Sequence, residues 1–64
     1  MIIKTFEACE TGVEEAYIEF VLWLDNEEVN GLTFLQIVSN NFTEAKNVKS
    51  YEYFTYNATV LFRE

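Results

Sequence analysis

Paired carboxylates are the one catalytic device that the composition of this chain could build. Two adjacent pairs occur, Glu14-Glu15 and Glu27-Glu28. A glycosidase needs two carboxyl groups held about 5 to 9 Å apart around its substrate. Neighbouring side chains of a strand point to opposite faces, and in a turn both point into water. We therefore expect both pairs to be solvated charges.

Other reactive groups are scarce. The chain has no His, one Cys, four basic residues and two Gly. Nucleophilic systems built on Ser and His or on Cys and His are therefore excluded within one chain, as are zinc sites made of Cys and His. No glycine-rich phosphate loop is present, and residues 25–36 do not match the calcium-loop pattern. We expect a protein that is not an enzyme and that holds no metal or cofactor.

The single cysteine, Cys9, cannot form a disulfide within one chain. We interpret it as a reduced, half-buried strand residue.

Negative charge is concentrated in the first half of the chain. Residues 1–32 carry eight acidic residues against Lys4 alone, and this half accounts for the whole net charge of -7. In residues 33–64 the three acidic and three basic residues balance. The electrostatic field of these negative charges extends about one Debye length, roughly 8 Å at physiological salt, and favours a basic partner. Four basic residues are too few to bind nucleic-acid phosphates directly.

The composition is that of one small folded domain spanning residues 1–64. Half of the residues are apolar and eleven are aromatic, so large rings can fill the core. A core of this size rarely contributes more than about 3 to 5 kcal/mol, and we therefore expect self-association as a homodimer. The chain shows neither a signal peptide nor the run of about 20 apolar residues that a membrane helix needs. We expect a cytoplasmic protein without membrane contact.

A strand is predicted over residues 2–9, ended by a turn at residues 10–12. Residues 13–25 fit two templates. As a strand, they place apolar side chains at every even position from Ala16 to Leu24. We favour the strand, because many of these residues prefer a pleated surface.

The alternative for residues 13–25 is a helix. Thr11 and Glu14 would then form a capping box at its start. The helix would leave Ile18, Val21 or Leu22 facing water, which counts against it. Its apolar stripe would consist of Val13, Ala16, Phe20 and Trp23.

The best-marked helix is predicted over residues 34–46. Thr33 as N-cap and Gln36 three residues later form a capping box, and Leu32 can contact Ile37 as a hydrophobic staple. Further apolar residues recur at helical spacing, namely Phe34, Leu35, Val38, Phe42 and Ala45.

From Val48 onward the pattern changes to strand. Residues 51–56 are nearly all β-preferring, and residues 59–62 form a last strand after a hairpin tip at Asn57-Ala58. The predicted order is β-β-α-β-β. This is an α+β fold, a small antiparallel sheet with one helix packed on one face and the other face open.

Function is expected on the uncovered surface. If residues 13–25 are a strand, its odd positions project together and mix aromatic rings with carboxylates. Trp and Tyr anchor interfaces more often than most residues do. The candidate acidic residues for partner binding are Glu14, Glu15, Glu19, Asp25, Glu27 and Glu28. The candidate aromatic residues, for partner binding or a dimer interface, are Tyr17, Trp23, Tyr51 and Tyr53.

These features favour a non-catalytic inhibitor that occupies the basic nucleic-acid-binding cleft of another protein. Duplex DNA carries one negative charge per about 1.7 Å of axis, so a mimic needs several carboxylates on a rigid frame. In size, charge and lack of catalytic groups the chain resembles the small inhibitors that phages and other mobile elements make against host nucleases, glycosylases or defence complexes. The alternative is a general interaction or assembly subunit that uses an aromatic sheet face and whose acidity only maintains solubility.

Overall fold

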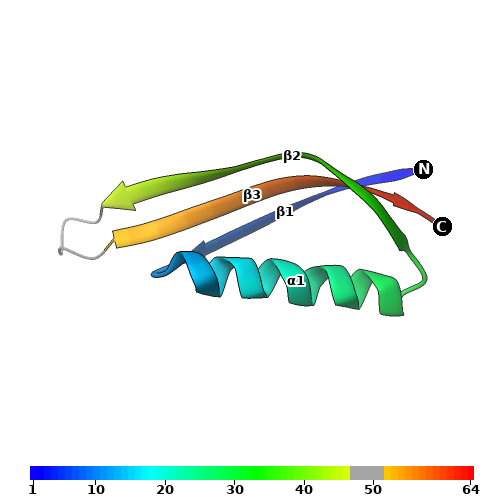
Figure 1. Cartoon of the computed structure of the whole chain (residues 1–64), viewed down its shortest axis with the longest axis horizontal. Coiled ribbons are helices and arrows are strands. Elements are labelled where there is room, and N and C mark those ends of the chain that lie inside the picture. The colour runs from blue at the N-terminus through cyan, green and yellow to red at the C-terminus, as the bar shows by residue number, and fades with distance from the viewer. Residues whose placement is uncertain (47–51) are drawn as a thin grey trace.

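The computed structural model of the chain describes residues 1–46 and 52–64. Its elements follow in the order β1 (Ile2–Glu10), α1 (Val13–Val29), β2 (Thr33–Lys46) and β3 (Glu52–Arg63). The strands form one antiparallel sheet in the order β1-β3-β2, and α1 lies along one face of it (Figure 1). The expected α+β class, with an antiparallel sheet and one helix, is confirmed.

The second element is a helix, so the strand predicted over residues 13–25 is wrong. α1 buries Ala16 and Phe20, which are four residues apart and therefore share one helix face. The capping box predicted at Thr11 is also wrong, because Gly12 is the N-cap and no side chain caps the helix. Packing of this one face against the sheet outweighs the β preference of the aromatic residues in the segment.

A glycine turn ends α1. Gly31 has a φ of 95°, a backbone conformation that favours glycine. Its N–H donates to the Glu28 carbonyl, and the Leu32 N–H donates to the Glu27 carbonyl, both at 3.0 Å. These bonds satisfy carbonyls that the end of a helix leaves without partners.

Residues 33–46 form strand β2, so the helix predicted over residues 34–46 is wrong. β2 pairs with β3 from Thr33 opposite Arg63 to Lys46 opposite Glu52. Register shifts after Phe34 and Ile37 each insert an extra residue into β2. Side chains on one face of a regular strand recur every two residues. Because each bulge adds one residue, those on the helix-facing side of β2 recur here every three residues, which resembles the spacing of a helix in the sequence.

β3 is one continuous central strand, so the hairpin predicted at Asn57-Ala58 is wrong. Asn57 pairs with Glu7 of β1 on one side and with Asn41 of β2 on the other. A residue paired on both sides gains more hydrogen bonds than a hairpin tip would allow. The order is therefore β-α-β-β, and no fourth strand occurs within residues 1–46 and 52–64.

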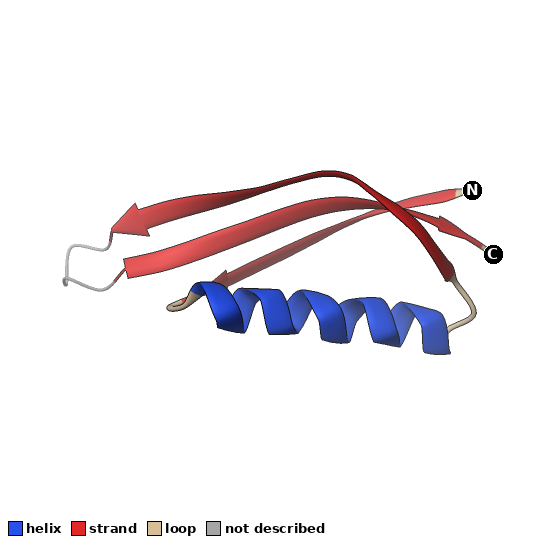
Figure 2. Cartoon of the chain, viewed as in Figure 1, coloured by secondary structure: helices blue, strands red, loops and turns tan. Residues whose placement is uncertain are grey.

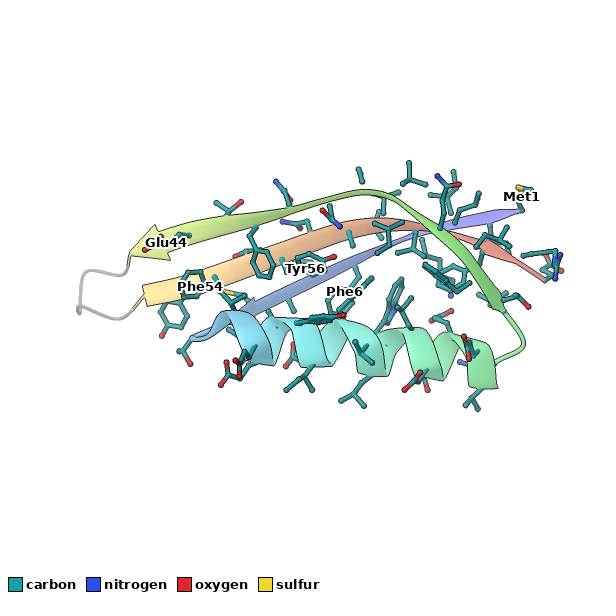
Figure 3. All side chains as sticks on the ribbon, in the orientation of Figure 1. Met1, Phe6, Glu44, Phe54 and Tyr56 are labelled. Atoms are coloured by element: carbon teal, nitrogen blue, oxygen red, sulfur yellow. The ribbon has the colours of Figure 1, made fainter. Side chains whose placement is uncertain are left out.

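The core lies between α1 and the central strand. Val60 and Phe62 of β3 are completely buried. Figure 3 shows Phe6 and Tyr56 projecting from the sheet toward the helix, where their ring centroids lie 6.5 Å apart. Among the described residues the buried apolar side chains are Ala8, Ala16, Phe20, Tyr56, Ala58, Val60 and Phe62. Three of these are Ala, so the core is thin and leaves large apolar side chains outside it.

Candidate protein-docking surface

α1 presents an apolar surface to solvent. Because Phe20 points at the sheet, Ile18 and Leu22 lie on the opposite side of the helix. Ile18 is 57% and Leu22 is 61% exposed, and Tyr17 and Val21 beside them are also exposed. We call the following residues the α1 apolar patch: Val13, Tyr17, Ile18, Val21 and Leu22, which line a shallow hollow of about 440 Å³ together with Glu14.

Exposed carboxylates bracket this patch along the helix. Glu14 and Glu15 in the first turn favour the helix, because acidic side chains interact well with the positive end of its dipole. Asp25 and Glu28 near the other end oppose the dipole, and the last turn has no basic residue. Helix stability therefore does not explain these two carboxylates. Asp25 shares a helix face with Ile18 and Glu28 with Val21, each seven residues earlier, and both carboxylates are exposed.

Glu19 lies beside Glu10, the last residue of β1. A hydrogen bond with the Glu10 side chain raises the pKa of Glu19 above its usual 4.5, and desolvation and the negative charge of Glu10 raise it further. Two carboxyl groups this close repel each other once both are ionised. A cationic group of a partner placed beside them would relieve this repulsion.

Glu27 does not belong to the exposed acidic surface, and its predicted outward position is wrong. Its side chain is only 9% exposed, and its carboxylate accepts a hydrogen bond from Lys4 Nζ at 2.7 Å. Helical periodicity places Glu27 on the same side of α1 as Phe20, seven residues earlier. The ion pair therefore joins β1 to the sheet-facing side of α1, and the Glu27 charge is neutralised inside the molecule.

Trp23 likewise does not project as an exposed anchor, because it is partly buried and packs against the core. Its ring centroid lies 5.2 Å from that of Phe6, 5.9 Å from that of Phe20 and 5.7 Å from that of Phe62. Such aromatic packing contributes about 0.5 to 1.5 kcal/mol per pair beyond burial. The predicted outward projection of Trp23 followed from the strand assignment, and it is wrong for the same reason.

Of the remaining predicted aromatic residues, Tyr17 and Tyr53 lie on different elements. Tyr17 is 54% exposed and belongs to the α1 apolar patch. Tyr53 is half-buried near the start of β3. Tyr51 lies outside the described residues.

Sequence reasoning missed Ile18 and Leu22 as surface residues and assigned them to the buried face of a strand. The sequence contained the signal for their exposure, because a helix over residues 13–25 leaves Ile18, Val21 and Leu22 facing water. In the structure the segment is helical and these three side chains are exposed. Apolar residues on the outer face of a helix are therefore not an argument against the helix.

The sheet face away from α1 is polar at its centre, where aromatic rings were expected. Thr5, Thr59 and Ser39 form one cross-strand row, and Glu7, Asn57 and Asn41 form the next. Both rows line a hollow of about 580 Å³. Cys9 is exposed further along β1, so its predicted half-burial is wrong. No group of three His, Cys, Asp or Glu residues that could hold a metal ion occurs in the described part of the chain.

Comparisons with protein-family models, with curated proteins and with solved structures gave no match for this chain. In the part of the chain that the structure describes, no helix combines the length and the apolar character needed to cross a membrane. The function is therefore inferred from the surface residues of α1 and of the sheet.

Proposed function

We propose that this protein is a non-catalytic binder that places the outer face of α1 in a basic groove of a target protein. It inhibits the target by occupying a nucleic-acid-binding cleft. The observation that carries the proposal is the α1 apolar patch, bracketed by exposed carboxylates on one helix. An apolar centre with a polar rim is the usual anatomy of a protein interface. A helix entering a groove is a recurring mode of protein recognition.

The spacing of the carboxylates supports a cleft that normally holds nucleic acid. From Glu14 to Glu28 the helix rises about 21 Å, at about 1.5 Å per residue. The exposed carboxylates on this stretch are those of Glu14, Glu15, Glu19, Asp25 and Glu28. Five carboxylates over this length are on average about 5 Å apart along the axis, compared with about 3.4 Å between the phosphates of one strand in duplex DNA. They can therefore meet several Lys and Arg side chains of a groove that binds phosphates.

The α1 apolar patch separates this proposal from a purely electrostatic mimic. Side chains such as Leu22 and Ile18 lose about 25 cal/mol of unfavourable hydration per Å² when a partner covers them. This part of the binding energy is independent of salt. Binding should consequently weaken with salt but not disappear.

The test uses the full-length protein, immobilised to capture the target from a lysate. We expect the captured protein to bind DNA or RNA, nucleic acid to displace it, and its affinity for this chain to fall at least tenfold between about 50 and 200 mM salt. The double variant Glu14→Lys/Asp25→Lys should abolish binding, because it reverses charge at both ends of the patch. A captured protein without affinity for nucleic acid would contradict the proposal.

The matched control is Glu7→Lys, which reverses one charge on the far face of the sheet. We expect it to leave target binding unchanged, because Glu7 lies away from α1. Leu22→Lys should weaken binding at every salt concentration, and its side chain is exposed enough for the fold to tolerate the change. Equal losses for Glu7→Lys and Glu14→Lys would show that only net charge matters and that α1 is not the binding surface.

An assembly subunit is the second candidate, and a separate observation favours it. Every residue of β2 from Thr33 to Glu44 is exposed, including several large apolar side chains. This strand is not used by the binding mode proposed for α1.

A further inference from the structure

The sheet is wider than the helix that covers it. Three strands about 4.8 Å apart span about 14 Å, whereas a helix is about 10 Å across. α1 contacts β1 the most and β2 the least, and β2 lies farthest from the helix over most of its length (Figure 2). As a result Phe42 is 45% and Val38 is 52% exposed.

The two edge strands differ in their protection against pairing with another chain. β1 carries Lys4, Glu7 and Glu10, and charges on an edge strand discourage such pairing. Residues 33–43 of β2 include no ionisable side chain, although the chain has a net charge of -7. The bulges disturb the first part of β2, but its pairing with β3 continues without a shift from Ser39 onward. β2 therefore has a regular, uncharged edge.

We propose that Ser39–Thr43 pairs antiparallel with the same segment of a second copy, which joins two sheets into one of six strands. A second copy has the same net charge of -7 and is repelled wherever carboxylates face each other. Contact between two α1 outer faces would bring Asp25 and Glu28 against acidic counterparts. The edge of β2 is uncharged up to Glu44, so two copies can approach there. This inference is independent of the proposed function, because it leaves Ile18, Val21 and Leu22 on the outer face of α1 free, although Tyr17 borders both surfaces.

The two-fold axis passes beside Asn41. In a symmetric antiparallel pair the same patch serves both copies, and residues directly opposite share a sheet face. With Asn41 opposite its own copy, Asn40 lies opposite Phe42 and Ser39 opposite Thr43. The two Glu44 side chains are then six residues apart along the strands, which is about 20 Å at about 3.4 Å per residue. This distance exceeds the Debye length of roughly 8 Å, so their repulsion is screened.

Dimer formation also covers apolar side chains that α1 leaves open. Ile37 and Phe42 line a hollow of about 320 Å³ between α1 and β2, with Tyr17 and Tyr56 on its other walls. Across the axis, the hollows of the two copies lie on the same side of the joined sheet. The solvent-accessible surface area of the chain is 4591 Å², which exceeds the about 4,250 Å² typical of a monomer of 7.5 kDa. A standard interface removes about 800 Å² of that surface from each partner.

The test measures the mass of the full chain in solution by sedimentation equilibrium. We expect a dimer of about twice 7.5 kDa at micromolar concentration. Asn41→Glu should weaken self-association at least tenfold, because it places like charges opposite each other at the axis. Thr5→Glu is the matched control, since it adds the same charge to the same sheet face on the other edge strand, and it should leave the dimer intact. Circular dichroism establishes that both variants are folded.

A cross-link makes the test independent of variant stability. In a Cys9→Ser background, Asn41→Cys should form a disulfide between copies under mild oxidation, because opposite residues of antiparallel strands have Cα atoms about 4.5 to 5.5 Å apart. Thr5→Cys in the same background should not. A monomeric wild type, a dimer broken by Thr5→Glu or by Leu22→Lys instead of Asn41→Glu, or an absent cross-link at position 41 would each overturn the proposal.

Discussion

The ion pair between Lys4 and Glu27 connects β1 to the sheet-facing side of α1. The Glu27 carboxylate is largely buried, whereas the Lys4 side chain is 41% exposed. Lys4→Met leaves this carboxylate without its partner. We expect the variant to lower the free energy of unfolding by about 1 to 3 kcal/mol, less than for a fully buried pair, because water still reaches Lys4. Urea unfolding followed by the fluorescence of Trp23 measures the change.

The control for this prediction replaces both partners. Lys4→Met/Glu27→Leu removes the buried charge together with its cation, and such replacements are often close to neutral. The double variant should therefore be more stable than Lys4→Met alone. If the two variants unfold at the same urea concentration, the buried carboxylate is not the cause of the loss.

Because the pKa of Glu19 is raised, its contribution to the free energy of unfolding decreases as the pH rises. The folded protein binds this proton more tightly than the unfolded chain, so the contribution is fully present below about pH 4.5 and is lost as the pH rises through the folded pKa. Repulsion between Glu10 and Glu19 remains at pH 7. Glu19→Gln keeps a hydrogen-bond donor without the charge, and we expect it to unfold at a higher urea concentration than the wild type at pH 7.

This gain should shrink as the pH falls through the folded pKa of Glu19 and be smallest below about pH 4.5, where the wild type carries the proton. Glu15→Gln is the control, because it removes the same charge from the first turn of α1. It should not stabilise the protein at pH 7, since an acidic side chain there favours the helix. A gain for Glu19→Gln that is constant from pH 4 to pH 7 would contradict the role of the Glu10 carboxyl group.

At the scale of elements, the helical state of residues 13–29 has a direct mutational signature. In a strand, Ile18, Phe20 and Leu22 would share one buried face, whereas in α1 only Phe20 faces the sheet. Phe20→Ala should cost about 3 to 5 kcal/mol of unfolding free energy and leave little folded protein. Ile18→Ala and Leu22→Ala should change it by no more than about 0.5 kcal/mol. Losses of several kcal/mol for all three variants would indicate the strand.

Part of this element structure follows from local sequence, and part does not. The strand at residues 2–9 and the β character of residues 51–62 are visible in side-chain preference alone. The capping box at Thr33 is a local signal that tertiary pairing overrides, because β2 gains a full ladder of hydrogen bonds with β3. The bulges after Phe34 and Ile37 then give the apolar residues helical spacing. Only the pairing with β3 reveals that Phe34, Ile37 and Phe42 share one sheet face.

For the whole molecule, the sequence predicts the acidic first half but not where its charges lie. Counting residues cannot distinguish Glu27, which is paired inside, from Glu28, which is exposed. That difference depends on which positions of α1 face the sheet, and the contacts of Trp23 with Phe6 and Phe62 depend on it too. The α1 apolar patch and the open edge of β2 both result from one helix covering a sheet of three strands, a consequence of topology that no local pattern contains.

The elongated shape of the molecule is consistent with the proposed self-association. Its radius of gyration is 13.3 Å, against about 10.7 Å for a compact domain of 64 residues. The extents of 43, 19 and 13 Å describe a flat, elongated layer. Such a layer leaves two surfaces to cover, the edge of β2 and the outer face of α1.

The central claim is that these two surfaces serve different partners, and amide NMR spectra of the full chain test it most directly. Spectra are compared at low and high protein concentration, and then with and without the captured target. We predict concentration-dependent shifts centred on Ser39–Thr43 and target-dependent shifts centred on Val13–Val29. If raising the concentration shifts α1 and leaves Ser39–Thr43 unchanged, or if the target shifts β2 and not α1, the account is contradicted.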